Sequence, residues 1–107
     1  MSPFGGNEVI DNAPRPKTYL YLYVADESPN SVRAIANLEA ICREYFEEGC
    51  YVLTVIDVMK DPLRALNDEI LVTPTLICLG APSVRILGDL SDREMVVRSL
   101  GLSDEAE

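Results

Sequence analysis

Two apolar runs separated by an amphipathic segment dominate the first half of the chain. Residues 18–25 and 51–58 are rich in aromatic and β-branched residues, and the first run has no polar alternation after Thr18. This pattern predicts strands, the first of them a central strand that is covered on both faces. Between the runs, apolar residues recur at intervals of three and four from Val32 onwards. They predict a helix over about residues 30–48.

The ends of this predicted helix carry residues that favour helix boundaries. Ser28 can cap the helix, Pro29 suits a first position that needs no N–H donor, and Gly49 favours a stop. A helix of this length between two strands predicts a right-handed βαβ unit with parallel strands.

A short helix is predicted next. Pro62 opens the segment of residues 63–69, which is weakly amphipathic through Leu63, Leu66 and Ile70.

The remaining pattern predicts a hairpin and a last helix. Residues 73–79 and 83–87 are two short apolar runs around Gly, Ala and Pro, which suit a hairpin loop. Ser91 and Glu94 have the spacing of a capping box for a helix that reaches about Leu100. The resulting order β-α-β-α-β-β-α is that of the thioredoxin-like α/β fold, a mixed sheet flanked by helices.

The chain divides into one domain and two tails. Residues 1–16 contain three prolines and few apolar residues, which predicts a flexible N-terminal tail. Residues 17–102 carry all the predicted elements and form one domain. The acidic residues 103–107 are predicted to be a solvated tail.

Charge and hydropathy exclude several function classes. The 107 residues include 9 Lys and Arg against 18 Asp and Glu, a formal net charge of −9. Nucleic-acid binding is therefore not expected, and an anionic membrane surface would repel the chain. No apolar run suits a membrane span or a secretory signal, so we expect a cytoplasmic protein.

The residue types that most often carry catalysis are absent or badly spaced. The chain has no histidine, which removes the commonest general base and metal ligand. In thioredoxin-type enzymes a reactive Cys-x-x-Cys follows the first strand, but this chain has Ser28-Pro29-Asn30-Ser31 there. We therefore predict no catalytic residues and no cofactor. A thioredoxin-like oxidoreductase that uses one of Cys42, Cys50 and Cys78 is the enzymatic alternative.

Clustered acidic residues are the only candidates for a metal site. Their spacing matches no calcium loop and no second ligand type is nearby, so we interpret them as solvated charges and predict no metal. They are Asp57, Asp61, Asp68 and Glu69.

Thr73-Pro74-Thr75 lies where thioredoxin-like folds carry a Thr-Pro segment with a cis proline. An X-Pro bond is the common place for a stable cis peptide, so Pro74 is a cis candidate. The alternative is an ordinary proline at the edge of a strand.

Several segments together resemble one family. They are spread in order over residues 17–100, and they are residues 17–19, 22–25, 28–34, 51–58, 70–76 and 88–94. Through them the chain resembles the KaiB family of small circadian-clock proteins.

This resemblance implies a regulator without enzymatic activity. It implies binding to the hexameric ATPase KaiC and modulation of its phosphorylation cycle, with KaiA or a sensor histidine kinase as further partners. It also implies a metamorphic protein, whose C-terminal half exchanges between a tetramer-forming ground state and a monomeric thioredoxin-like fold. We therefore expect self-association as a dimer or tetramer, and a switching segment from about residue 63 to residue 100.

The resemblance singles out five charged residues as candidate partner contacts. Arg33 matches the family pattern near the start of the exposed helix face, and the others are Arg85, Asp89, Asp92 and Arg93. The alternatives are a solvated helix charge for Arg33, a turn residue for Asp89 and stabilisation of a helix N-terminus for Asp92.

The chain departs from the family pattern in two places. Ile77 and Cys78 follow the Thr-Pro-Thr segment, where cyanobacterial members carry a basic residue. Ser99-Leu100-Gly101 replaces the common Gly-Leu-Asp, in a region associated with the choice of fold. Pro74, Ser99 and Gly101 are therefore candidate fold-switch positions. A KaiB paralogue in stress response or signalling, without a clock role, is the alternative function.

Overall fold

The computed structural model describes residues 17–79 and 83–102. The two predicted tails, residues 1–16 and 103–107, and the predicted hairpin loop at residues 80–82 lie outside these ranges.

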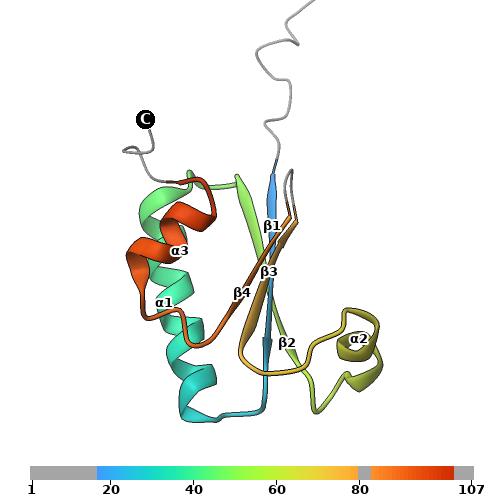
Figure 1. The fold of residues 1–107 in the computed structure, drawn as a ribbon. Helices are drawn as coiled ribbons and strands as arrows, with labels where there is room; N and C mark the ends of the chain where they lie inside the picture. The colour runs from blue at the N-terminus through green and yellow to red at the C-terminus, as the bar shows by residue number, and fades with distance from the viewer. Residues whose placement is uncertain (1–16, 80–82, 103–107) are drawn as a thin grey trace, which may run out of the picture.

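A four-stranded sheet separates α1 and α3 on one face from α2 on the other (Figure 1). The predicted order of elements is confirmed. The elements are β1 (Thr18–Val24), α1 (Pro29–Tyr45), β2 (Tyr51–Asp57), α2 (Pro62–Asn67), β3 (Thr75–Leu79), β4 (Val84–Leu87) and α3 (Arg93–Ser99).

The sheet is mixed, as predicted, with the strand order β2-β1-β3-β4. β1 is parallel to β2 and antiparallel to β3, and β3 and β4 form an antiparallel pair. β1 is therefore a central strand, and β2 and β4 are the two edges.

Hydrogen bonds between two serines define the start of α1. The Ser28 Oγ accepts from the Ser31 backbone N–H at 3.3 Å, which confirms the predicted cap. The Ser31 side chain is fully buried, and its Oγ accepts from the Ala25 N–H at 3.1 Å and from the Ser28 hydroxyl at 2.9 Å. The positions of a thioredoxin dithiol are thus occupied by a structural hydrogen-bond network.

The end of α1 differs from the prediction. The helix ends at Tyr45, and Phe46 already has extended backbone geometry. The Phe46 ring packs against Tyr51, with 5.2 Å between ring centroids. Gly49 does not end the helix; it has a φ of +84° in the turn that follows.

The start of α3 corrects the predicted capping box. Asp92 is the cap, and its Oδ1 accepts from the Met95 N–H at 3.2 Å. The reciprocal bond of a capping box, from the Ser91 N–H to the Glu94 carboxylate, is replaced by a bond from the Ser91 N–H to the Asp89 Oδ1 at 3.0 Å. The helix therefore begins one residue later than the Ser91–Glu94 pattern predicts.

The alternation of β1 side chains creates two unequal layers. Leu20, Leu22 and Val24 are buried on the side of α1 and α3. Tyr23 is buried on the opposite side, in a small cluster with Ile56 and Ala65 of α2. Because α2 is only 6 residues long, it covers one end of this second face and leaves the rest open.

No helix in the two described ranges is long and apolar enough to cross a membrane.

Candidate protein-binding surface

Large apolar side chains are exposed on and around α2. We call them the α2 surface; they are Met59, Leu63, Leu66, Leu71 and Val72, with exposed fractions of 71%, 72%, 70%, 91% and 50%. Exposed apolar patches on soluble proteins commonly mark interaction sites. The α2 surface is therefore a candidate site for a protein partner.

The local sequence explains why these side chains point outward. Pro62 occupies the first turn of α2, and the helix buries only Ala65 against the sheet. Leu63 and Leu66, which the amphipathic pattern placed on the inner face, lie on the outer face instead. Ile70 does pack inward, against the cluster that contains Ala65.

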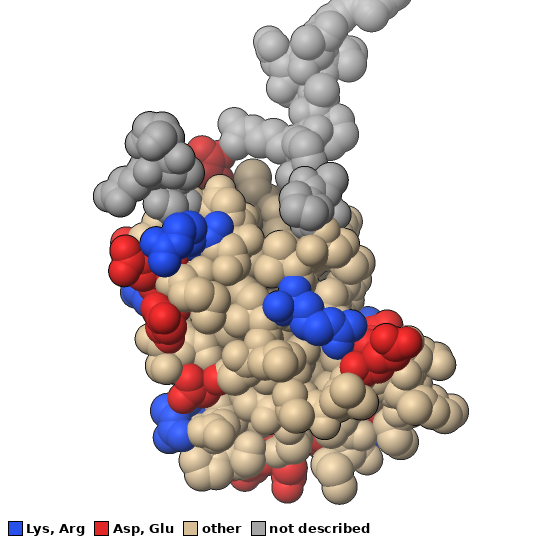
Figure 2. All heavy atoms as spheres, in the orientation of Figure 1, with Lys and Arg blue, Asp and Glu red and all other residues tan. Residues whose placement is uncertain are grey.

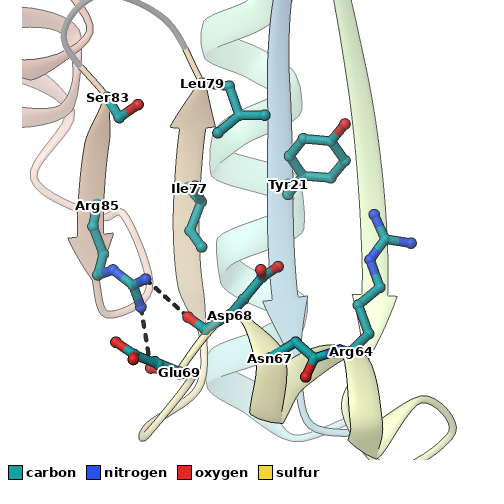
Figure 3. Close-up of a pocket in the computed structure, with 9 residues that line it drawn as sticks. All are labelled: Tyr21, Arg64, Asn67, Asp68, Glu69, Ile77, Leu79, Ser83 and Arg85. Carbon is teal, nitrogen blue, oxygen red and sulfur yellow. Dashed lines mark hydrogen bonds between the residues drawn. The ribbon is translucent and has the colours of Figure 1, made fainter.

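The C-terminal end of α2 is fastened to the sheet. Arg85 of β4 donates to the backbone carbonyl oxygens of Asp68 and Glu69, at 2.9 and 3.2 Å (Figure 3). A cation at the last carbonyl groups of a helix is favourable. The Tyr23 hydroxyl donates to the Asp68 carboxylate, and burial, with the nearby Asp68, raises the pKa of Tyr23. These contacts fix the position of the α2 surface.

Arg33 and Asp89 contact each other on the opposite face of the molecule. The Arg33 Nε lies 3.2 Å from the Asp89 Oδ2, and the Asn37 side-chain amide donates to the Asp89 carbonyl oxygen at 2.9 Å. Arg33 also contacts the Asn30 side chain. Hydrogen bonds from the hydroxyl and N–H of Ser91, and then from Arg33, hold the pKa of Asp89 below its usual value.

Asp92 and Arg93 also make contacts within the chain. Asp92 caps α3, as described above. The Arg93 guanidinium pairs with the Glu44 carboxylate and lies 5.7 Å from the centroid of the Tyr45 ring. Both contacts join α3 to the last part of α1.

The five predicted contact residues therefore do not form one site. Arg33, Asp89 and Arg93 connect α1 to the segment from Asp89 to Arg93. Asp92 caps α3, and Arg85 lies on the other face of the sheet. Figure 2 shows basic side chains lying beside acidic ones rather than gathering into a basic patch.

The three candidate fold-switch residues have separate roles here. The Thr73–Pro74 bond is cis, as predicted, and the Pro74 carbonyl oxygen accepts from the Gly88 N–H at 2.9 Å. Gly101 has a φ of +75°, with Gly101 N–H bound to the Arg98 oxygen and Leu102 N–H bound to the Val97 oxygen. This is the Schellman arrangement that ends helices. Ser99 is exposed in the last turn of α3.

The buried thiols are poorly suited to nucleophilic chemistry. Burial raises the pKa of Cys42 to about 11 and also raises that of Cys78. A thiol is nucleophilic as the thiolate, so both are weak nucleophiles at neutral pH. Within residues 17–79 and 83–102, no three acidic or cysteine side chains are grouped to hold a metal ion.

Comparison with known proteins identifies the family. The family model described as the KaiB domain matches residues 21–102. The chain belongs to the KaiB family. The circadian clock oscillator protein KaiB of Trichodesmium erythraeum is 53% identical over 92 residues, which cover 84% of this chain and 88% of that protein. The KaiB of Microcystis aeruginosa is 56% identical over 88 residues, 80% of this chain and 84% of the relative.

Solved structures confirm the thioredoxin-like fold. The N-terminal domain of Synechococcus elongatus SasA has a TM-score of 0.66 and 23% identity, and the match covers 89% of this KaiB-family chain and 93% of that domain. Chloroplastic thioredoxin z has a TM-score of 0.63 and 21% identity, and the match covers 81% of each chain.

Sequence analysis missed the α2 surface as a candidate site. Leu63 and Leu66 recur at a helical interval, and such a pattern normally predicts a buried face. The sequence contains no signal that this face would stay exposed, because periodicity shows that a face is apolar but not that another element covers it.

Proposed function

We propose that the chain is a non-catalytic clock regulator that binds a KaiC-like ATPase in the cytoplasm and modulates its phosphorylation cycle. Membership of the KaiB family supports this proposal, since the relatives reported above are named circadian clock oscillator proteins. The observation that carries it is the α2 surface, which offers an apolar contact area.

The physical properties of the α2 surface suit partner binding. Fully burying one exposed leucine side chain contributes about 1.5–3 kcal/mol, and Leu63, Leu66 and Leu71 are each at least 70% exposed. In the thioredoxin-like form Arg85 and Tyr23 already fix the end of α2, so this form requires little further ordering of the segment on binding. A preformed surface loses less conformational entropy and binds more tightly for the same buried area.

The proposal includes exchange of the C-terminal half between two folds. The N-terminal half has two strands of 7 residues and a helix of 17, whereas β3, β4 and α3 have 5, 4 and 7 residues. Two packings that differ by a few kcal/mol can interconvert. The thioredoxin-like arrangement is the form we propose to bind the ATPase, with KaiA or a sensor histidine kinase as a later partner. The other form is the one we propose to self-associate.

Gel filtration of the chain with a KaiC-like ATPase, with and without ATP, tests this function. Leu66→Asp is expected to abolish the complex because it places a charge in the apolar contact. Val32→Asp is the matched control, since Val32 is a 54% exposed apolar residue of α1 on the other side of the sheet. Absence of a complex in every nucleotide state would exclude the proposed function, and equal loss with both variants would exclude the α2 surface as its site.

A further inference from the structure

The face of the sheet that α2 leaves open contains a pocket of about 630 Å³. Its floor consists of the strand residues Tyr21, Ile77 and Leu79 (Figure 3). Arg64 of α2 lines one side and Arg85 of β4 the other. The pocket thus combines an apolar floor with two guanidinium groups.

Arg64 is the cation of this pocket that lies over its aromatic floor, whereas Arg85 is engaged by the backbone carbonyl oxygens of Asp68 and Glu69. Its guanidinium carbon lies 5.4 Å from the centroid of the Tyr21 ring, a cation–π contact. The described part of the chain provides no carboxylate within ion-pair distance of Arg64, in contrast to Arg33, Arg93 and Arg98. Arg64 therefore presents a guanidinium group beside an apolar floor, with Asp68 nearby through the Tyr23 hydroxyl that both side chains contact.

Acidic groups limit how much negative charge the pocket can accept. The Asp68 carboxylate projects towards the floor of the pocket and accepts from the Tyr23 hydroxyl (Figure 3). Glu69 lines the side on which Arg85 binds the end of α2. A single carboxylate placed against Arg64 is favourable, whereas further carboxylates would be repelled by Asp68 and Glu69. Such like-charge repulsion is a common source of specificity.

An apolar row continues from the pocket along the sheet. Tyr19 is paired with Val52 on one side and Leu79 on the other, and it shares the face of Tyr21 because alternate strand residues point the same way. Tyr19, Val52 and Leu79 are 41%, 37% and 47% exposed. A small molecule in the pocket would leave most of this row uncovered. An extended chain segment lying across the strands would cover both.

We propose that this open sheet face binds an extended segment of a protein partner that carries one carboxylate flanked by apolar side chains. The carboxylate accepts hydrogen bonds from Arg64, and the flanking side chains pack on Tyr21, Ile77 and Leu79. This site goes beyond the proposed function: it is separate from the α2 surface and does not depend on the partner being an ATPase.

Amide NMR titration of the full chain with a short probe peptide tests the inference. The probe is acetyl-Gly-Leu-Glu-Phe-Gly-amide, and its Gln analogue removes only the charge. Saturable shifts are expected at the amides of Tyr21, Ile77 and Leu79, with about tenfold weaker binding of the Gln analogue. Arg64→Gln should weaken binding of the Glu peptide by the same factor. Arg43→Gln makes the same charge change on α1 and should leave the affinity for this peptide unchanged.

A third peptide separates specific recognition from general attraction. The analogue with three consecutive glutamates in place of the single one is expected to bind more weakly than the probe. Tighter binding of the three-glutamate peptide, shifts confined to α1 and α3, or no shifts at all would overturn the inference. The comparison of peptides uses the unmodified chain, so it decides the matter even if Arg64→Gln impairs folding.

Discussion

The Arg33 Nε lies 3.2 Å from the Asp89 Oδ2, although the two residues are 56 positions apart in the chain. With the hydrogen bond from the Asn37 side chain to the Asp89 carbonyl oxygen, this contact fastens the β4–α3 connection to α1. Leu90, which follows directly, has a φ of +63° and is buried in the main core. The placement of α3 therefore depends on a polar contact with the N-terminal half.

Asp89→Asn is expected to destabilise the described fold in a pH-dependent way. The pKa of Asp89 is lowered in the folded state by its bonds to Ser91 and Arg33. Its stabilising contribution is therefore complete above the pKa of the unfolded chain, about 3.9, and is lost as the pH falls through the lower folded value. Urea unfolding measures the free energy of unfolding of Asp89→Asn and of the unmodified chain. The difference between these two free energies should be constant at pH 6–7 and should shrink below about pH 4.

Asp61→Asn provides the control for this titration. Asp61 precedes α2, but its side chain makes no cap hydrogen bond. The urea midpoint of Asp61→Asn at pH 7 should match that of the unmodified chain. A difference for Asp89→Asn that persists unchanged at pH 3 would show that the Asp89 carboxylate is not the group responsible.

Gly101→Ala is expected to destabilise the end of α3. Gly101 has a φ of +75°, and a left-handed backbone conformation costs a residue with a Cβ about 1–2 kcal/mol. The free energy of unfolding in urea should fall by about this amount. Ser99→Ala, on an exposed position of the same helix, should change it by less than about 0.5 kcal/mol. Equal effects of the two substitutions would contradict the role assigned to Gly101.

The βαβ half could be predicted closely because local and tertiary preferences agree there. Ser28 and Pro29 favour the helix start that the core also requires, and the strand runs match β1 and β2. Even so, the end of α1 was predicted too late, because the packing of Phe46 on Tyr51 is a tertiary contact that no local pattern reports.

The remaining features depend on contacts between distant parts of the chain. The Ser91–Glu94 spacing predicted Ser91 as the cap of α3, whereas the structure has Asp92 there, with Asp89 bound both to the Ser91 N–H and to the distant Arg33. The open-face pocket likewise places Arg64 over Tyr21, 43 positions away. Periodicity reports which face of an element is apolar, but not whether another element covers it.

Ser31→Ala removes a single hydroxyl at the start of α1 and is expected to lower the free energy of unfolding substantially. Ser31 is fully buried, and its Oγ accepts from the Ala25 N–H. Its removal leaves the part-buried Ala25 N–H without this acceptor, and an unsatisfied buried donor costs about 1–3 kcal/mol. Ser28→Ala removes the helix cap and the hydroxyl that donates to the Ser31 Oγ, but it leaves the Ala25 N–H bound, and it should cost about 1 kcal/mol. Urea unfolding measures both, and a Ser31→Ala effect smaller than that of Ser28→Ala would argue against the buried network.

Cys42 and Cys78 are expected to resist thiol reagents in the folded chain. Burial raises the pKa of both thiols, that of Cys42 to about 11, so they remain protonated at neutral pH. Labelling with a maleimide at pH 7, followed by peptide mass spectrometry, should find both unmodified in the native chain and modified in guanidinium chloride. The denatured sample is the control for reagent access. Rapid native labelling of Cys42 or Cys78 would instead favour a single-cysteine oxidoreductase, because that chemistry requires an accessible thiolate.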